Sequence, residues 1–282
     1  MTTETNKNGS LLEIVQEWAA SETLKLPVFP DVARDLYGIM SNEDASINEV
    51  AAVIAKDQAL AAQMLKVANS SFFAGLNKVR TIRESIMRLG VNQVFNYLVA
   101  GSQKDFYLSK DPLIGKLLQV LWKHALATAK GSQWLLRKTG YSELADEGFL
   151  AGLFHDIGKL LLLKVLESIK TNAEIPISEP FIFEVLDSMH VEQGFKLMTE
   201  WNIPEIYCEV VKNHHEEEFD NTDSLLIAVR ITDHVCAKTG VSLDPDPGIV
   251  TATLPEVHSM TIKEIVLAEL EVVIEDALEA GP

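Results

Sequence analysis

The stretch Phe149-Leu150-Ala151-Gly152-Leu153-Phe154-His155-Asp156-Ile157-Gly158-Lys159-Leu160 places a histidine, an aspartate and a lysine in an otherwise apolar segment. Burying such groups without partners is costly. A metal ion would satisfy both His155 and Asp156, because imidazole nitrogen and carboxylate oxygen can coordinate the same transition-metal ion. We therefore predict a metal site within a helical, apolar part of the protein.

The composition indicates a folded protein that does not bind nucleic acid over a broad surface. Apolar residues make up 47% of the 282 residues, which is enough to build a core. The net charge of −17 disfavours wrapping of a nucleic-acid backbone, which requires clustered lysine and arginine. No apolar run approaches the roughly 20 residues of a membrane span. We expect a cytoplasmic protein without membrane contact, whose Cys208 and Cys236 are buried reduced thiols.

Helix start signals are frequent and strand signals are nearly absent, which predicts an all-α, multi-helical bundle. Residues 46–49 and 81–84 have the capping-box form, and Asp111-Pro112 is a further start signal. The predicted helices lie near residues 11–20, 31–41, 47–55, 58–69, 82–88, 91–106, 112–138, 143–166, 181–200, 204–213, 223–238 and 261–279.

A domain boundary is predicted at residues 109–112. All seven histidines follow it, and a loop rich in proline occupies residues 243–248. The predicted parts are an N-terminal extension (1–20), a first helical part (21–110), a metal-binding part (111–240) and a C-terminal loop and helix (241–282). The C-terminal helix carries an apolar stripe, which we expect to pack on the rest of the protein or on a second copy in a homodimer.

Each further polar candidate also has a purely structural interpretation. His124 and His190 lie on predicted helices, where an isolated histidine is more often a core or surface residue than a ligand. The pair His214-His215 closes a helix, where cationic side chains favour the helix dipole. Asp233 lies one turn after Arg230 and could pair with it.

Taken together, these candidates favour a metal centre. Five helices each offer a metal-competent group on or near an apolar face, and helical bundles build metal sites from side chains on facing helices. The donors are nitrogen and oxygen without thiolate, which suits iron, manganese, zinc or cobalt better than a structural zinc-thiolate site. We expect a divalent ion, with iron or manganese first and zinc, cobalt or nickel as alternatives. Two ions bridged by a carboxylate suit hydrolysis of a phosphoryl group.

The order of these residues resembles the HD superfamily of metal-dependent phosphohydrolases. Residues 154–159 and 213–216 are similar to its HD-GYP subgroup, whereas residues 26–30, 67–73 and 81–90 resemble the diagnostic pieces of HDOD domains. The resemblance covers roughly residues 20 to 240. It implies an HD-like helical core, formed by residues 111–240, with an N-terminal helical subdomain.

The resemblance also implies that histidines and aspartates from several helices hold two metal ions. One ion would be surrounded by His124, His155, Asp156 and Asp233. The second ion would be held by Asp156, which bridges the pair, and by His190 and His214, with His215 close to it. Lys159 would face a phosphate oxygen as a point charge, so Asp156 and Lys159 are the expected catalytic residues.

Two departures from related sequences bear on function. The Gly-Tyr-Pro element that follows the paired histidines in HD-GYP enzymes is absent, because residues 216–221 read Glu-Glu-Glu-Phe-Asp-Asn. Hydrolysis of cyclic dinucleotides therefore lacks its main sequence support. Many HDOD members look poor in metal ligands, whereas this chain keeps every histidine and aspartate of the pattern.

Two functions remain open from the sequence. The first is a signalling protein that binds, and hydrolyses, a phosphorylated small molecule such as a nucleotide. The second is a non-catalytic regulatory module, whose metal site is structural or senses a ligand and whose surface recruits a signalling protein.

Overall fold

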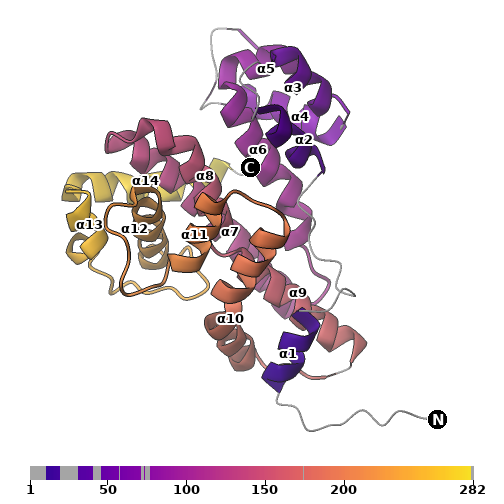
Figure 1. Cartoon of the computed structure of the whole chain (residues 1–282), viewed down its shortest axis with the longest axis vertical. Coiled ribbons are helices and arrows are strands. Elements are labelled where there is room, and N and C mark those ends of the chain that lie inside the picture. The colour runs from indigo at the N-terminus through magenta and orange to yellow at the C-terminus, as the bar shows by residue number, and fades with distance from the viewer. Residues whose placement is uncertain are drawn as a thin grey trace.

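A computed structural model describes residues 11–19, 31–40, 46–56, 58–70, 73, 77–173 and 175–280. Every regular element in these residues is a helix (Figure 1), which confirms the predicted all-α fold. The α-helices are α1 (Leu11–Ala19), α2 (Asp31–Met40), α3 (Ile47–Ile54), α4 (Gln58–Ala68), α5 (Ile82–Leu89), α6 (Val91–Gln103), α7 (Pro112–Lys138), α8 (Ala145–Phe154), α9 (Ile157–Asn172), α10 (Glu179–Glu200), α11 (Glu205–Asn213), α12 (Ser224–Lys238), α13 (Pro255–Ser259) and α14 (Glu264–Ala280). Short 3-10 helices are η1 (Lys104–Tyr107), η2 (Ser142–Leu144) and η3 (Thr251–Thr253).

The first half of the chain forms a group of short helices, in which α2, α4 and α5 pack on α6, and α3 packs on α2, α4 and α5 (Figure 1). α3 begins with the predicted capping box, in which Ser46 Oγ accepts from the Glu49 amide at 3.3 Å and Glu49 Oε2 accepts from the Ser46 amide at 2.9 Å. α5 begins at Ile82, after the N-cap residue Thr81, but the Glu84 side chain accepts from the Arg80 amide and not from the Thr81 amide that a full capping box requires. Local hydrogen bonds therefore fix where both helices start.

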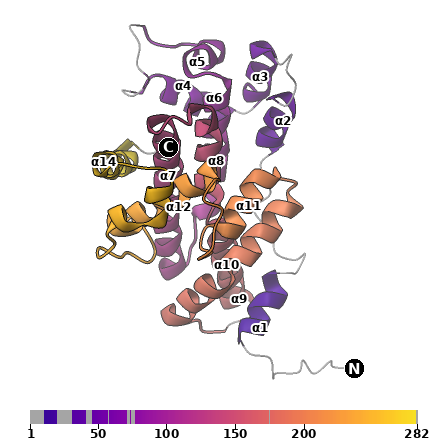
Figure 2. The ribbon, with the colours of Figure 1, turned by 60° about the vertical axis from the view of Figure 1, so that its left-hand side comes forward.

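The long helix α7 lies at the centre of the second half. It starts at Pro112, after the Asp111 carboxylate accepts hydrogen bonds from the amides of Leu113 and Ile114 at 3.0 and 3.1 Å. α8, α12 and α14 all pack against α7, and Figure 2 shows α7 between α14 and α8. α10 packs against α9 and α11, and α1 packs against α9.

Two glycines let α8 approach α7 closely. A Cβ atom at Gly152 would lie 2.6 Å from the Thr128 carbonyl oxygen and 2.8 Å from the Ala129 nitrogen. A Cβ atom at Gly148 would lie 2.4 Å from Leu136 Cδ1. The close approach brings the C-terminal end of α8 next to the middle of α7, where His124 lies.

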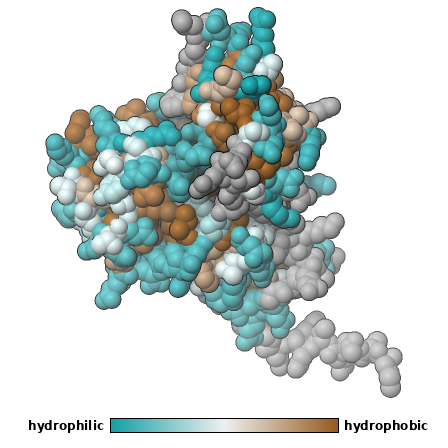
Figure 3. Space-filling model, turned by 45° about the horizontal axis from the view of Figure 1, so that its top comes forward, coloured by the Kyte–Doolittle hydropathy of each residue, from teal (hydrophilic) through white to brown (hydrophobic). Residues whose placement is uncertain are grey.

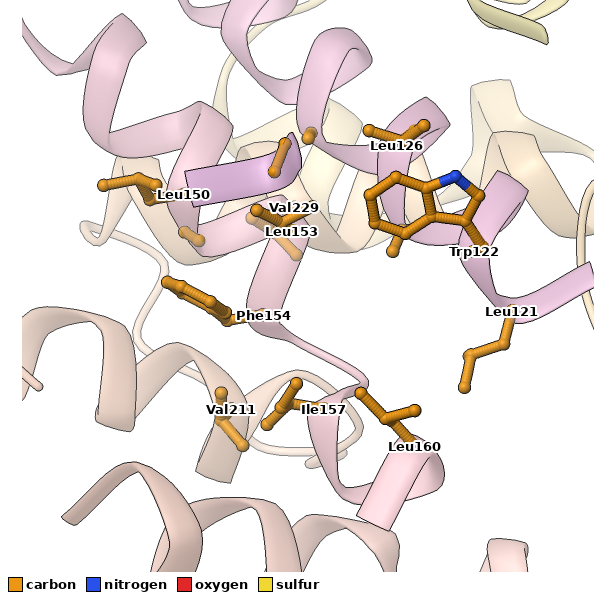
Figure 4. Packing of buried hydrophobic residues seen from close by; sticks show 14 of the residues in the cluster. Leu121, Trp122, Leu126, Leu150, Leu153, Phe154, Ile157, Leu160, Val211 and Val229 are labelled. Carbon is orange, nitrogen blue, oxygen red and sulfur yellow. The ribbon is translucent and has the colours of Figure 1, made fainter. Parts of the chain in front are cut away.

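The prediction of one helix over residues 143–166 is wrong. α8 ends at Phe154 and α9 begins at Ile157, so His155 and Asp156 lie at a break between two helices. Figure 4 shows buried apolar side chains on both sides of this break. Because both helices are buried, the apolar pattern continues through the break, and hydrophobicity alone does not reveal it.

Three other predicted boundaries differ from the structure. α9 ends at Asn172, six residues after the predicted end at residue 166. α6 ends at Gln103, and the residues that follow tighten into η1, although the sequence predicts one helix to residue 106. α14 begins at Glu264, three residues after the predicted start, and is preceded by the unpredicted short helix α13. In the described residues, no helix is both long enough and apolar enough to span a membrane.

Three residues of the apolar stripe of α14 are buried, whereas two apolar residues outside the stripe are exposed. Leu267, Leu270 and Ile274 are buried where α14 packs on α7 and α12, as one of the two sequence alternatives predicts. Ile265 and Val272 on the same helix are exposed. Figure 3 shows apolar patches on the visible surface with hydrophilic side chains between them.

Candidate metal centre

His155 and Asp156 lie where α8 ends and α9 begins. Asp156 is the N-cap residue of α9, a position where an aspartate usually accepts a hydrogen bond from an amide of the first turn. Its side chain makes no such bond. The carboxylate is only 3% exposed and faces four histidine rings instead. The break between the helices therefore places the Asp156 carboxylate in a buried position among histidine rings.

The sequence-predicted ligands gather into two clusters in the described part of the chain. The first cluster consists of His124, His155 and Asp233. The second cluster consists of Asp156, His190, His214 and His215. Within each cluster, the candidate ligand atoms lie within 4.8 Å of one another. The fold thus brings together all seven residues from α7, the α8–α9 junction, α10, the end of α11 and α12.

In the first cluster, nitrogen and oxygen atoms of three side chains lie close together. His124 Nε2 lies 3.2 Å from Asp233 Oδ1 and 3.0 Å from His155 Nε2. Burial by itself lowers the pKa of His124, but hydrogen bonds to Asp156 and Asp233 outweigh burial and raise this pKa well above its usual value. Burial lowers the pKa of His155 to about 4, so this ring is neutral near pH 7. The cluster therefore favours a positive charge between its side chains.

The two oxygens of Asp156 face different clusters. Oδ2 lies 3.4 Å from His124 Nε2 and 3.6 Å from His155 Nε2, in the first cluster. Oδ1 lies 3.7 Å from His190 Nε2 and 3.5 Å from His214 Nε2, in the second. Although burial opposes ionisation, Lys159 and the surrounding histidines hold the pKa of Asp156 well below its usual value. The carboxylate is thus ionised and shared by both clusters.

Backbone carbonyl groups orient four of the five histidine rings. Each of these rings places Nδ1 against one carbonyl oxygen: His124 against Val241 at 2.8 Å, His155 against Gly152 at 2.7 Å, His190 against Leu186 at 2.6 Å and His214 against Val211 at 2.8 Å. Because a carbonyl oxygen only accepts hydrogen bonds, Nδ1 must carry the proton. For His155 and His190, whose pKa values are lowered to about 4, the neutral ring then leaves Nε2 unprotonated, the arrangement typical of metal-ligating histidine.

Three buried polar atoms of the second cluster lack hydrogen-bond partners among the described residues. Asp156 Oδ1, His190 Nε2 and His214 Nε2 are buried without a donor in the described structure. Buried acceptors that face one another without a donor are costly. A divalent cation among them would satisfy all three, and their nitrogen and oxygen donors suit a transition metal. The residues therefore fit a metal ion.

Lys159 contacts the shared carboxylate. Its Nζ donates a hydrogen bond to Asp156 Oδ2 at 2.7 Å. Burial by itself lowers the pKa of Lys159, but Asp156 and Asp233 outweigh burial and raise it, so the ammonium is charged near pH 7. Its side chain is 18% exposed. Lys159 therefore neutralises the shared carboxylate, and part of the lysine side chain reaches solvent.

Gly158 of the opening stretch has a role that the sequence alone does not reveal. A Cβ atom there would lie 1.9 Å from the His190 carbonyl oxygen and 2.8 Å from the Gly194 nitrogen. α9 and α10 thus meet backbone to backbone beside a ligand of the second cluster. The only sequence signal for this contact is a glycine next to the His-Asp pair.

Arg230 does not pair with Asp233, the structural alternative left open by the sequence. It pairs with Glu256 of α13, with Nε 2.6 Å from Oε1. Asp233 is left facing His124 and His155. The role of Glu256 was not predicted, because 26 residues separate it from Arg230 and no local pattern links them.

Comparison with protein families places most of the chain in one family. The model of the HDOD domain matches residues 26–217, which is most of the chain. The chain belongs to the HDOD family. The resemblance inferred from the His-Asp pair and the N-terminal motifs is therefore confirmed.

Solved structures share this fold. An HDOD domain protein of unknown function from Geobacter sulfurreducens has a TM-score of 0.76 at 21% identity, covering 95% of this chain and 96% of its own. A Shewanella amazonensis SB2B protein, proposed to be a metal-dependent phosphohydrolase, has a TM-score of 0.74 at 19% identity, covering 95% and 98%. A Marinobacter aquaeolei VT8 protein, proposed to act in signal transduction, has a TM-score of 0.67 at 20% identity, covering 95% and 63%. At these identities the likeness shows the fold.

Two longer proteins are related in sequence. An uncharacterized protein of Treponema pallidum (strain Nichols) is 26% identical over 67% of this chain, and YuxH of Bacillus subtilis (strain 168) is 30% identical over 51%. The matched regions span 37% and 34% of those proteins, about a third of their length.

The HDOD motifs of the first half have structural roles where the structure describes them. The Asn69 side chain donates to the carbonyl groups of Leu65 and Val79 and accepts from the Val79 amide, each at 2.9 Å. Arg88 donates to the carbonyl groups of Ala68 and Asn77. These bonds join the end of α4 to residues 77–79 and to α5. The motif at residues 26–30 lies outside the described residues, as do parts of residues 67–73.

Proposed function

We propose that this HDOD protein holds two divalent metal ions and binds and hydrolyses a phosphorylated small molecule such as a nucleotide. The observation that carries the proposal is the carboxylate of Asp156, whose Oδ2 faces one cluster and whose Oδ1 faces the other. A carboxylate placed in this way supports a pair of ions, which clamp a phosphoryl group in two-metal sites. Iron or manganese is expected first, with zinc, cobalt or nickel as alternatives.

In this proposal, some residues hold the metal ions and Lys159 contacts the phosphate. Bound ions would supply Lewis-acid activation of the phosphoryl group and lower the pKa of water. His124, His155 and Asp233 would hold one ion, with Asp156 shared. Lys159, charged and next to Asp156, would neutralise a phosphate oxygen as negative charge develops. To do so, its ammonium must turn part of its hydrogen bonding from Asp156 to the ligand.

The exposed side chains of the site indicate where the ligand would approach. His155 and His214 are only 1% and 3% exposed, so a ligand from solvent does not meet these two rings directly. The side chains of Asp233 and Lys159 are 19% and 18% exposed, and His215 is open to solvent. A ligand would therefore meet Lys159 and His215 first.

A second candidate function is a non-catalytic regulatory module that acts through a signalling protein partner. Its supporting observation is the deep burial of most candidate ligands, which suits ions that stabilise the fold. In addition, the three exposed residues Glu216, Glu217 and Glu218 follow His215 and would repel an anionic ligand. In this alternative, the metal site is structural or senses a ligand.

One experiment separates the two functions. The purified chain is analysed for bound metal and then assayed, with Mn²⁺ or Fe²⁺ added, against nucleoside phosphates, cyclic dinucleotides and other phosphoesters. Two ions per chain with release of phosphate supports the hydrolase. Two ions without turnover across the panel supports the regulatory module. Absence of metal binding after loading under reducing, chelator-free conditions overturns the metal centre itself.

A further inference from the structure

Arg230 is a buried cation that supports the site without lying in either cluster. The residue is 8% exposed. Its Nη1 lies 3.1, 2.9 and 2.9 Å from the carbonyl oxygens of Asn213, His214 and Glu216. The guanidinium also lies over the Phe219 ring, 4.5 Å from its centre. One side chain thus binds the whole turn that carries His214 and His215.

The position of this arginine follows from helix geometry. α11 ends at Asn213, and the last carbonyl groups of a helix have no partner inside it. A cation at this end satisfies them and interacts favourably with the helix dipole. Because the bonded carbonyl groups belong to the ligand residue His214 and its neighbours, Arg230 fixes the peptide planes from which both rings project.

The C-terminal segment holds Arg230 in place. Glu256 of α13 is 1% exposed and accepts from Arg230 Nε at 2.6 Å, so the buried charge is paired. The same segment supplies the Val241 carbonyl group that accepts from His124 Nδ1. Val241 and Glu256 lie beyond position 217, where the match to the HDOD model ends. The segment after α12 therefore supports one histidine of the first cluster and the paired histidines of the second.

We propose that Arg230 and Glu256 are positioning residues for the second cluster, through which the C-terminal segment sets the affinity of the second metal ion. The inference rests on the proposed metal centre. Removing a group that orients a metal ligand costs about 10–100-fold in affinity, and we expect a loss of this size for the second ion only.

The test compares Arg230→Met, Arg230→Lys and Glu256→Gln with the parent chain. Titration with Co²⁺ alone, followed by calorimetry and visible absorption, gives the number of ions and the affinity of each. Lys238→Met is the matched control, because Lys238 lies on the same helix but belongs to neither cluster. Its Nζ pairs with Glu271 Oε1 at a distance of 2.6 Å. We expect Arg230→Met and Glu256→Gln to weaken the second ion, Arg230→Lys to restore part of the affinity, and the control to bind like the parent.

A second readout does not require metal. Imidazole ¹⁵N spectra of the metal-free variants should show changed signals for His214 and His215 and unchanged signals for His155. Unchanged His214 signals together with parent-like affinity for both ions would overturn the inference. If the parent chain binds no Co²⁺, the proposed function fails and the spectra alone decide the role of Arg230. If Arg230→Met does not fold, Glu256→Gln decides, because it keeps a hydrogen-bond acceptor of the same size.

Discussion

At the residue scale, Asp156 is the one candidate ligand that faces both clusters. Asp156→Asn keeps the shape of the side chain but removes the charge that would bridge two ions. We expect the variant to lose both ions, as measured by metal content per chain after loading with Mn²⁺. Asp233→Asn is the matched control, because Asp233 belongs to the first cluster alone and its loss should cost one ion. An Asp156→Asn variant that retains two ions would refute the bridging role.

Lys159 allows a complementary test at the same scale. Lys159→Met removes the charge but keeps much of the length of the side chain, and the histidines and carboxylates stay in place. We expect the metal content to be unchanged and the affinity for inorganic phosphate, measured on the Mn²⁺-loaded protein, to fall. Because Asp156 loses its ammonium partner, the metal-free variant should also melt at a lower temperature. Unaltered phosphate affinity would exclude contact between Lys159 and the ligand.

At the element scale, the contact between α9 and α10 depends on Gly158. In Gly158→Ala, the new methyl group would collide with the backbone of α10 at His190, so one helix must move. We expect unfolding by urea to require about 1–3 kcal/mol less free energy than in the parent chain. The second metal ion should be weakened more than the first, because His190 moves with α10.

Gly38→Ala is the control for this prediction. Gly38 also lies in a helix, and a Cβ atom there meets nothing within 4 Å. The change should be neutral or stabilise the protein by about 0.5–1 kcal/mol, since alanine is the better helix former. Equal destabilisation by both substitutions would show that the cost at Gly158 does not come from the contact with α10.

At the scale of the whole molecule, the buried histidines make the stability of the metal-free protein depend on pH. Burial lowers the pKa of both His155 and His190 from the ordinary 6.5 to about 4 in the folded chain. Between these values the unfolded chain binds more protons, so the free energy of unfolding rises with pH. The raised pKa of His124 acts only above pH 6.5, and therefore does not cancel this slope.

Urea denaturation of the metal-free chain at several values between pH 4 and pH 7.5 measures this dependence. We expect stability to be highest near pH 6.5, to fall steadily toward pH 4, and to fall again above pH 6.5 as His124 loses its proton. His190→Gln should reduce the slope, whereas His258→Gln, at an exposed position, should leave it unchanged. A stability that does not vary over this range would mean that neither ring is held neutral by the fold.

The sequence by itself determined the helical class, several helix starts and the candidate ligands. Ser46 and Asp111 begin their helices through bonds to amides two or three residues away, so a short stretch contains all the information needed. The candidate ligands stand out because polar groups in apolar segments require partners. These signals are local and can be recognised without knowing which helices meet.

The family resemblance already implied how the candidates divide, but only the tertiary structure decided what holds and orients them. The helix break at Asp156, and the split of its oxygens between two clusters, arise from packing among α7, α10, α11 and α12. His124 is oriented by Val241, 117 residues away, and Arg230 is paired with Glu256 of α13. These partners depend on how whole helices pack, because each bond joins segments that are distant in the sequence. No local pattern in either segment identifies the other.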